Sequence, residues 1–537
     1  MLSHARFLSF EKLFWIGVLL IAIGLRWFHP DAWPDTREAE HVLSVLEGIR
    51  PTNLLTVVQR LTSLTLGHTA FVARLPALVT GTILIMTPLL LRKWLGSFQV
   101  LLLAGALALS PTLTFASRNV EGLIVPWTLA FFGALSALHK ATRISMICLS
   151  LALASGSDGP AAVLTALLAA RLGGARFSLR ALLAPLFTLA FVMLFAVLFS
   201  NSPTLDPHAI VTQLFAQPSF STQRLLAGFL LYEPPAWIGA IAAMGISLVK
   251  RQHLPLRAFW LTWLIAGFAL AIAHPTLSST ISSTIGAFGL ASYAYPALVR
   301  VVLRPSRGSL LVSIATTLVL IYSAIALFRM IDSQSISWAA APFVSLSILI
   351  AIALFSTLAG VPMPWHSMLA AASLLLLLYT ISANFRLNHF APNNPAEPYR
   401  IETFADGTEL LQRSLAQLQA QQSPNQNALT IYYDTDTPAS LRWLLRDWSY
   451  APPEEAMVWL RQGNISSPPP QQGTWVKQTL ELTQHSSLRS LSCQSLEQCL
   501  ALIRWIVFRT PPERSTTQWQ LWIPQSLLST PLLKAYE

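Results

Sequence analysis

The chain has 537 residues, of which 53% are hydrophobic and 11% are charged, and its formal net charge is +11. A soluble globular protein carries about a quarter charged residues, so this composition excludes an ordinary soluble fold for most of the chain. Runs of roughly 18 or more apolar residues, each long enough to cross a bilayer core of about 30 Å, recur as far as residue 385. The sequence therefore predicts an α-helical polytopic membrane protein.

About thirteen apolar runs are long enough to be interpreted as transmembrane helices, although the fifth and sixth are short. The first follows Lys12 and has no clear small-residue cleavage site behind it, so we expect a retained span rather than a signal peptide. The predicted spans cover residues 13–29, 69–91, 98–116, 122–139, 144–156, 159–172, 181–200, 233–249, 257–274, 283–302, 309–328, 336–358 and 367–385.

Basic residues gather in every second connection between these spans. The connections are short, and the positive-inside rule places them in the cytoplasm. We therefore expect a multi-pass cell-membrane protein with a cytoplasmic N-terminus and no nucleic-acid partner. The connections at 30–68 and 201–232, and the tail from residue 386, then lie on the outer face. The basic residues concerned are Arg92, Lys93, Lys140, Arg143, Arg171, Arg176, Arg180, Lys250, Arg251, Arg257, Arg300, Arg304 and Arg307.

An acid-rich stretch, WPDTREAEHVLSVLEG, follows the first span on the outer face. Its apolar residues, and those of the next segment, recur with a helical period. This pattern predicts two amphipathic helices lying on the membrane surface within residues 35–66. The first apolar stripe is Ala39, Val42, Leu43 and Leu46, and the second is Leu54, Val57, Val58, Leu61 and Leu64.

Two interpretations of Asp35 and Glu38 stay open. Their spacing matches a capping box, and such a pair can simply start a helix. Alternatively, a carboxylate at the mouth of a membrane cavity can accept a proton from a hydroxyl group or bind a divalent metal. Other outer connections also supply ionisable groups, since Arg118 and Glu121 follow the third span and Asp158 joins the fifth to the sixth. Such groups near a membrane are costly and indicate a functional site.

After residue 385 the composition becomes polar. Residues 386–400 are rich in proline and asparagine and predict a linker. Residues 401–537 predict a small extracytoplasmic α/β domain, attached to a transmembrane domain of residues 1–385. The expected helices lie within ADGTELLQRSLAQLQAQQ, PASLRWLLRDW and SLEQCLALIRWIVF, and the expected strands within ALTIYYDTD, TWVKQTLELTQ and TQWQLWIP.

Six segments carry a family resemblance, and their order is more specific than any one of them. They are PDTREAEHVLSVLEG, TAFVARLPALVTGTILIMTPLLLRKWLG, ALSPTLTFASRNVEG, GSDGPAAVL, LLAGFLLYEPPAWIGAI and IYYDTDTPASLRWLLRDW. Together they resemble membrane glycosyltransferases of the GT-C superfamily, such as protein O-mannosyltransferases and the aminoarabinose transferase of lipid A. The branch that the chain resembles most is the one named flippase-activity-associated. The resemblance implies a GT-C-like fold and a sugar donor linked to a polyprenyl phosphate.

The resemblance also implies roles for particular residues. Asp35 matches the first catalytic aspartate, which is the base toward the acceptor hydroxyl or a metal ligand. Arg118 and Glu121 match a second outer motif that helps to hold the donor or a metal. A phosphate leaving group needs cations, so Arg37 joins Arg118 as a candidate for phosphate binding, and Glu38 joins the catalytic candidates. Asp35 and Glu121 would be the candidate ligands of a divalent metal, Mg²⁺ or Mn²⁺.

The chain departs from the family pattern at four places. Glu121 stands where an aspartate is commoner, and AIAHPTLSST stands where a Lys-x-Pro-Trp-like segment is expected. Thr36 follows Asp35 where relatives usually have glutamate. Asp158 stands where relatives often have lysine, so a cation that would bind phosphate is missing.

The expected function is transfer of a sugar from a polyprenyl-phosphate-linked donor to an acceptor hydroxyl at the outer face. The acceptor would be a glycan, a lipid or a protein, and membrane lipids would be the other partners. The alternative is a catalytically inactive relative that acts as a partner in glycan export or cell-surface glycan assembly. A transporter or flippase ranks third, because no internal repeat is detectable and ionisable residues gather at one face.

Overall fold

The computed structural model describes most of the chain, in two compact units. The first unit comprises Met1–Ala32 and Val45–Pro392, and the second comprises Trp33–Ser44 and Asn393–Glu537. The described residues are 2–28, 36–46, 53–176, 220–250, 254, 256–302, 307–333, 341–358, 364–390, 394, 397–400, 402–405, 407–421, 429–463, 474–486, 498, 501–502, 505 and 514–528.

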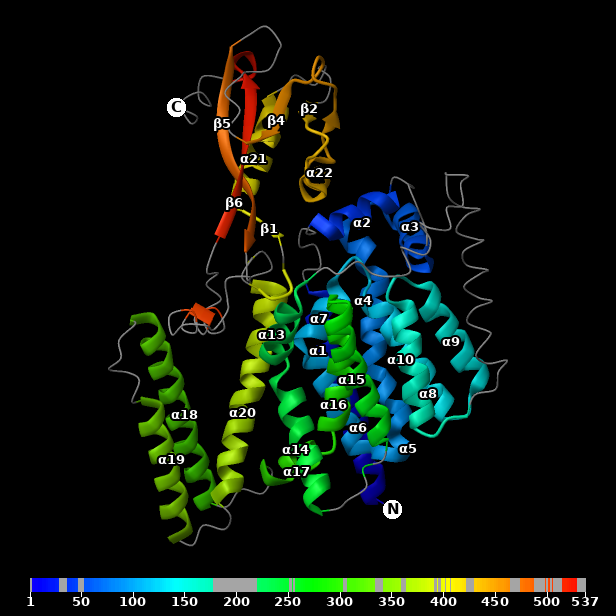
Figure 1. Ribbon diagram of the computed structural model, residues 1–537, viewed down its shortest axis with the longest axis vertical. Coiled ribbons are helices and arrows are strands. Elements are labelled where there is room, and N and C mark those ends of the chain that lie inside the picture. The colour runs from blue at the N-terminus through cyan, green and yellow to red at the C-terminus, as the bar shows by residue number, and fades with distance from the viewer. Residues whose placement is uncertain are drawn as a thin grey trace. The chain divides into compact units, whose positions relative to one another are not determined.

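The first unit is built from helices (Figure 1). A helix satisfies all its backbone hydrogen bonds within one segment, as a segment surrounded by lipid requires. The helices are α1 (Leu2–Trp27), α3 (Leu54–Leu66), α4 (Ala70–Met86), α5 (Arg92–Leu95), α6 (Ser97–Leu109), α7 (Pro111–Arg118), α8 (Ile124–Leu138), α9 (Thr142–Ala154), α10 (Gly159–Leu172), α13 (Thr222–Tyr232), α14 (Pro234–Lys250), α15 (Arg257–Ala273), α16 (Leu277–Ala291), α17 (Tyr295–Val302), α18 (Arg307–Ser333), α19 (Ala341–Leu358) and α20 (Pro364–Phe385). A 3₁₀ turn, Thr87–Leu91, joins α4 to α5, and a π-helical turn, Arg386–Phe390, continues α20. Helix α2 (Thr36–Leu46) begins in the second unit and ends in the first.

Two helices in the described part are long and apolar enough to cross a membrane, Ala70–Leu95 and Trp365–Phe390. Two bent pairs would each make one more span: α6 with α7, bent by 58°, and α13 with α14, bent by 81°. These apolar helices support a location in the membrane. The number of spans and their orientation stay predictions, and the predicted span 181–200 lies outside the described residues.

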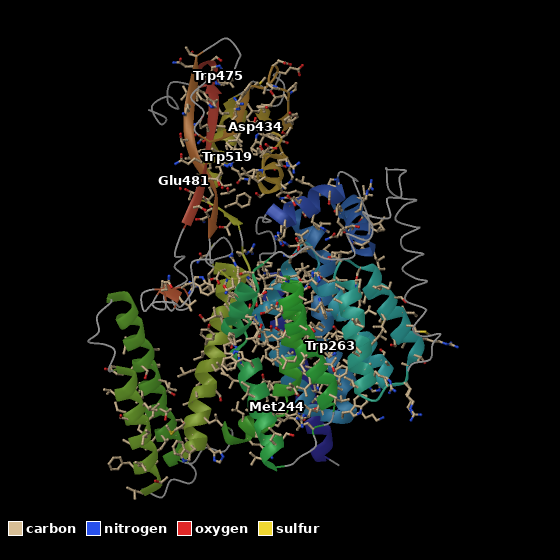
Figure 2. The ribbon with its side chains drawn as sticks, in the orientation of Figure 1. Met244, Trp263, Asp434, Trp475, Glu481 and Trp519 are labelled. Atoms are coloured by element: carbon tan, nitrogen blue, oxygen red, sulfur yellow. The ribbon has the colours of Figure 1, made fainter. Side chains whose placement is uncertain are left out.

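The core of the first unit forms where α16 packs against α15 and α8. Every residue of α16 is buried. A Cβ added at Gly286 of α16 would lie 2.4 Å from the backbone nitrogen of Leu264 on α15, so only glycine permits this approach. Trp263 of α15 (Figure 2) packs edge-on against Phe131 of α8, with 5.3 Å between the ring centroids. Small residues and aromatic rings therefore fix the three helices together.

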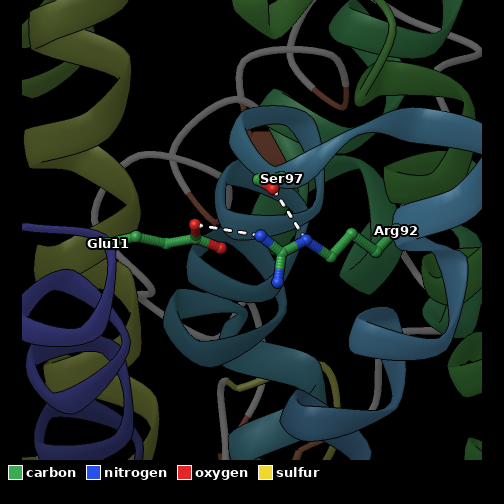
Figure 3. A network of polar contacts seen from close by, with 3 residues as sticks. All are labelled: Glu11, Arg92 and Ser97. Carbon is green, nitrogen blue, oxygen red and sulfur yellow. Dashed lines mark hydrogen bonds and ion pairs between the residues drawn. The ribbon is translucent and has the colours of Figure 1, made fainter. Parts of the chain in front are cut away.

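An ion pair links α1 to the start of α5. Arg92 Nη2 donates to Glu11 Oε2 at 3.1 Å, and Arg92 Nε donates to Ser97 Oγ at 2.8 Å (Figure 3). Arg92 belongs to the connections that the positive-inside rule places in the cytoplasm. Its side chain is 53% exposed, so we expect the pair to contribute less than about 1 kcal/mol to stability.

The second unit contains a six-stranded sheet with the strand order β1–β5–β6–β4–β2–β3. Strand β2 pairs in parallel with β3 and β4, and the other pairs are antiparallel. The strands are β1 (Glu402–Phe404), β2 (Thr430–Tyr433), β3 (Ser449–Tyr450), β4 (Val458–Gln462), β5 (Trp475–Ser486) and β6 (Arg514–Pro524), and the helices are α21 (Gly407–Gln421) and α22 (Ala439–Leu445). A sheet-containing C-terminal domain is therefore confirmed. The predicted helix within SLEQCLALIRWIVF lies largely outside the described residues.

The two faces of this sheet differ in chemistry. Leu460 of β4 lies opposite Leu521 of β6, and both join a core with Trp519 (Figure 2) and the leucines of α21 and α22. Side chains alternate between faces along a strand, so the neighbouring register positions belong to the other face. There Trp459 lies opposite Trp522, and the two rings form a smaller aromatic cluster.

Candidate functional site

The helix predicted over residues 98–116 is broken at Ser110. The Ser110 hydroxyl accepts a hydrogen bond from the backbone N–H of Leu113 at 3.2 Å, which makes it the N-cap of α7. Pro111 occupies the first helical position, where its missing N–H costs nothing. The Ser-Pro pair therefore ends α6 and starts α7, so the predicted span 98–116 is bent by 58° at this point.

Glu233 meets this break from the other bent pair, since it lies between α13 and α14. Its Oε1 accepts a hydrogen bond from the Ser110 hydroxyl at 2.6 Å and another from the Thr112 backbone N–H at 3.0 Å. The carboxylate is fully buried. The first turn of a helix has unsatisfied N–H groups and a positive partial charge, so it favours an acidic side chain at this place.

Two asparagines of the α20 region hold the carbonyl groups at the same break. Asn384 Nδ2 donates to the carbonyl of Leu109 at 3.0 Å and to Thr114 Oγ1 at 3.1 Å. Asn388 Nδ2 donates to the carbonyl of Pro111 at 3.4 Å. The last carbonyls of a helix have no partner within it, and Asn384 supplies one for Leu109 at the end of α6.

Arg26, at the end of α1, completes this arrangement. Its guanidinium is fully buried and donates to the carbonyls of Leu107 and Ala108, at 3.3 and 3.2 Å, and to Ser117 Oγ at 3.2 Å. A cation at the C-terminal end of α6 complements the negative end of that helix. Arg26 therefore ties α1 to both halves of the broken helix.

Arg118, the predicted phosphate-binding residue, lies in the last turn of α7 and is 8% exposed. Its Nη1 donates to the carbonyl of Phe28 at 2.6 Å and to that of Arg26 at 3.3 Å. Arg118 thus caps the end of α1, which sequence reasoning did not foresee. Its role toward a phosphate stays a prediction, and the same guanidinium would have to serve both purposes.

Glu121, a predicted catalytic residue, lies in a tight turn after α7. Its backbone N–H donates to Asn119 Oδ1 at 2.8 Å, and Gly122 has a φ of +62°. Gln59 of α3 is buried and its Nε2 donates to the carbonyl of Val120 at 2.7 Å. The turn is therefore fixed from inside and from the neighbouring helix, so the position of Glu121 is well defined.

Asp158 lies between α9 and α10 and is 6% exposed. Helix α8 packs against both α9 and α10, and chain direction alternates along the three, so Asp158 returns to the end of the bundle where Glu121 lies. Burial raises the pKa of Asp158 to about 6, and a hydrogen bond with Ser278, at the start of α16, opposes this shift. Within their bounds, α8 and α16 carry no ionisable residue. Asp158 therefore loses its proton at a higher pH than an ordinary aspartate.

The other predicted site residues lie elsewhere in the chain. Asp35 lies outside the described residues. Arg37 is exposed and Glu38 is buried on α2, in the segment that belongs to the second unit, whereas Arg118 and Glu121 belong to the first. The structure therefore brings Arg118 and Glu121 together at the end of α7, and a site shared with Asp35, Arg37 and Glu38 stays a prediction.

A metal site also stays a prediction. In the part of the chain that the structure describes, no three His, Cys, Asp or Glu side chains gather in a way that could hold a metal ion. Asp35, one of the two candidate ligands, is not in that part.

Sequence reasoning gave no role to Arg26, Glu233, Asn384 and Asn388. One signal was present, because an ionisable residue within or beside an apolar run is costly and usually has a purpose. Arg26 ends the first run, and Glu233 interrupts LLAGFLLYEPPAWIGAI. Their partners come from more than 80 positions away, which a pattern along the chain does not reveal.

No family model matches the chain, and no curated protein matches it significantly. Among solved structures, it is similar to ArnT from Cupriavidus metallidurans bound to undecaprenyl phosphate, with a TM-score of 0.48, 12% identity, and coverage of 84% of this chain and 93% of that one. The apo state of the same ArnT gives a TM-score of 0.46 at 14% identity, covering 86% and 93%. The oligosaccharyltransferase of Archaeoglobus fulgidus, in complex with Zn and sulfate, gives 0.33 at 12% identity, covering 80% and 61%. Likenesses of this degree identify neither a family nor an activity.

Proposed function

We propose that the chain is a membrane glycosyltransferase that moves a sugar from a polyprenyl-phosphate donor to an acceptor hydroxyl at the outer face of the membrane. The observation that carries the proposal is the fixed segment from Arg118 to Glu121, which holds a cation and a carboxylate three residues apart at the end of a bent pair of membrane helices. Asp158 lies at the same end of the bundle. An enzyme acting at the membrane surface needs charged groups collected at one end in this way.

The chemistry divides between a base and a cation. The acceptor oxygen forms a bond to the anomeric carbon while the bond from that carbon to the donor phosphate breaks. Asp35 would take the acceptor proton, and Glu121 or Glu38 would orient the reacting groups. The leaving phosphate carries negative charge, and Arg118, assisted by Arg37, would stabilise it. The sugar inverts its configuration in this single displacement.

The test is transfer of labelled sugar from a set of polyprenyl-phosphate donors in proteoliposomes. Asp35→Asn is the informative variant, because asparagine remains a good helix N-cap while it cannot act as a base. Glu40→Gln, in the same acid-rich stretch, is the matched control, since Glu40 is exposed on α2 and has no proposed role. Loss of transfer in Asp35→Asn alone supports the proposal, and equal transfer in both variants removes Asp35 from the chemistry.

A second candidate function is that of a non-catalytic partner in glycan assembly. One observation favours it: Arg118 caps α1, a structural task that needs no donor. The absence of transfer by the unaltered protein across all donors, together with a loss of cell-surface glycan when the chain is deleted, would support this second function.

A further inference from the structure

The two bent helix pairs of the first unit meet at one carboxylate. Glu233 lies at the bend of 81° between α13 and α14, and its Oε1 receives the hydrogen bonds of Ser110 and Thr112 at the bend of 58° between α6 and α7. The other oxygen, Oε2, is buried without a hydrogen-bond partner in the described part of the chain. The hydrogen bonds of this side chain are therefore directed at α7.

Helix α7 is short and depends on other elements for its position. It has eight residues, all of them buried. An isolated helix of fewer than about 12 residues is unstable, so tertiary contacts must hold α7 in place. Its first turn is held by Glu233, and Arg118 in its last turn bonds to the end of α1. The turn that carries Glu121 follows directly.

We propose that Glu233 is a positioning residue that joins the two bent pairs and thereby sets the place of α7, Arg118 and the Glu121 turn. It acts through Oε1, which accepts the hydrogen bonds of Ser110 and Thr112 at the N-terminus of α7. The consequence for catalysis rests on the proposed function, whereas the consequence for the position of the turn does not.

The test measures the position of the turn without requiring activity. Glu121→Cys is placed in a background in which Cys148, Cys493 and Cys499 are changed to serine, and the rate of its reaction with a thiol reagent is followed in detergent. We expect Glu233→Ala to raise this rate at least about fivefold, because the turn then opens more often. Glu233→Gln retains the Oε1 acceptor, so its rate should stay within about twofold of the parent.

Two further variants make the comparison specific. Ser110→Ala removes the hydrogen bond to Glu233 and also the N-cap bond to Leu113, so it should raise the rate as well. The double variant should show a smaller increase than the two single increases combined, because both changes remove the same Ser110–Glu233 hydrogen bond. Glu409→Ala is the matched control, because this exposed glutamate of α21 pairs only with Arg413 in the described contacts and should leave the rate unchanged. The test remains valid if Glu233→Ala does not fold, because the rate of Ser110→Ala can then be compared directly with that of the Glu409→Ala control.

An unchanged rate in a folded Glu233→Ala variant would overturn the proposal. A rate in Glu233→Gln as high as in Glu233→Ala would overturn it as well, since the negative charge rather than the acceptor oxygen would then matter. In the chain with native Glu121, Glu233→Ala should lower kcat while the KM for the donor changes less. If the unaltered protein transfers no sugar, the proposed function fails, but the labelling rates still decide the role of Glu233.

Discussion

Asp158 is a buried acid whose burial opposes its negative charge. Its pKa is raised from 3.8 to about 6, so the contribution of this residue to stability is present below pH 3.8 and is lost as the pH rises through 6. Asp158→Asn removes the charge and keeps an acceptor oxygen for Ser278. We therefore expect the variant to be more stable than the unaltered protein at pH 8, by on the order of 2–3 kcal/mol, with the difference shrinking toward zero at pH 4.

The measurement is thermal unfolding in detergent at pH 4, 6 and 8. Glu481→Gln on β5 serves as a control, because Glu481 is exposed and should show no such trend. An Asp158→Asn variant that is less stable than the unaltered protein at pH 8 would mean that the ionised carboxylate is stabilised by its surroundings.

Gly122 combines a positive φ of +62° with a crowded position. A Cβ added there would lie 2.5 Å from Leu55 Cδ2 on α3. Gly122→Ala should therefore destabilise the protein by about 1–3 kcal/mol. Adding Leu55→Ala makes room for the methyl group but leaves the backbone strain, so the double variant should lose less stability than the two single losses added together. Strictly additive losses, measured by thermal unfolding, would show that contact with Leu55 is not the cause.

For single residues, the sequence predicted the location at a helix end better than it predicted the hydrogen-bond partners. The sequence indicated that Arg118, Glu121 and Asp158 lie at the ends of spans, and the structure places all three at the ends of helices. It could not indicate that Arg118 caps α1, because the acceptors are carbonyl groups about 90 residues away. Backbone acceptors leave no trace in residue types, so this kind of contact cannot be inferred from composition or spacing.

At the scale of elements, α3 holds the Glu121 turn by its polar side. Gln59, Thr56 and Ser63 are buried, whereas Leu61 and Leu64 are exposed. Gln59 Nε2 donates to two carbonyls, that of Val120 and that of Ala73. A helix that buries its amide and exposes Leu61 and Leu64 suits a lipid environment on its outer side.

Gln59→Leu keeps the approximate size of the side chain but leaves both carbonyls without this donor. We expect a loss of about 1–3 kcal/mol in the free energy of unfolding, because both hydrogen bonds of the buried amide are lost. Thr65→Ala on the exposed side of α3 should change stability by less than about 0.5 kcal/mol. Equal effects of the two substitutions, measured by thermal unfolding, would contradict this role of Gln59.

In the described part of the chain, the long elements predicted from hydrophobic periodicity are present, but the break at Ser110 was not predicted. Residues 98–116 form one apolar run, and hydropathy alone does not distinguish a straight helix from one broken at Ser110. The capping signal, serine followed by proline, was present in the sequence. In the second unit β4 was missed, because its few residues follow a charged, proline-containing loop. Long elements with strong periodicity are predictable, whereas short ones depend on partners distant in sequence.

At the scale of the whole molecule, the chain forms two units, and each has a hydrophobic core of its own. The first buries aromatic and small residues between apolar helices, and the second buries leucines between a sheet and its helices. Large hydrophobic side chains are exposed along α18 and α19, as surfaces in contact with lipid require. The second unit contains an open six-stranded sheet, and lipid would leave the hydrogen-bonding groups at its edges without partners. We therefore expect the sheet to lie on one side of the membrane.

The positive-inside rule predicts that the sheet lies on the outer side. Thiol labelling from one side of the membrane can test this prediction. In the cysteine-free background, Glu409→Cys on α21 should react with a membrane-impermeant thiol reagent in intact cells. Thr142→Cys, at the start of α9 between Lys140 and Arg143, should react only after the membrane is permeabilised. Both positions are exposed, so accessibility to the reagent alone decides the result. The opposite pattern would place the basic connections outside. It would also contradict the proposed function, because Glu121 and Asp158 would then lie at the cytoplasmic face.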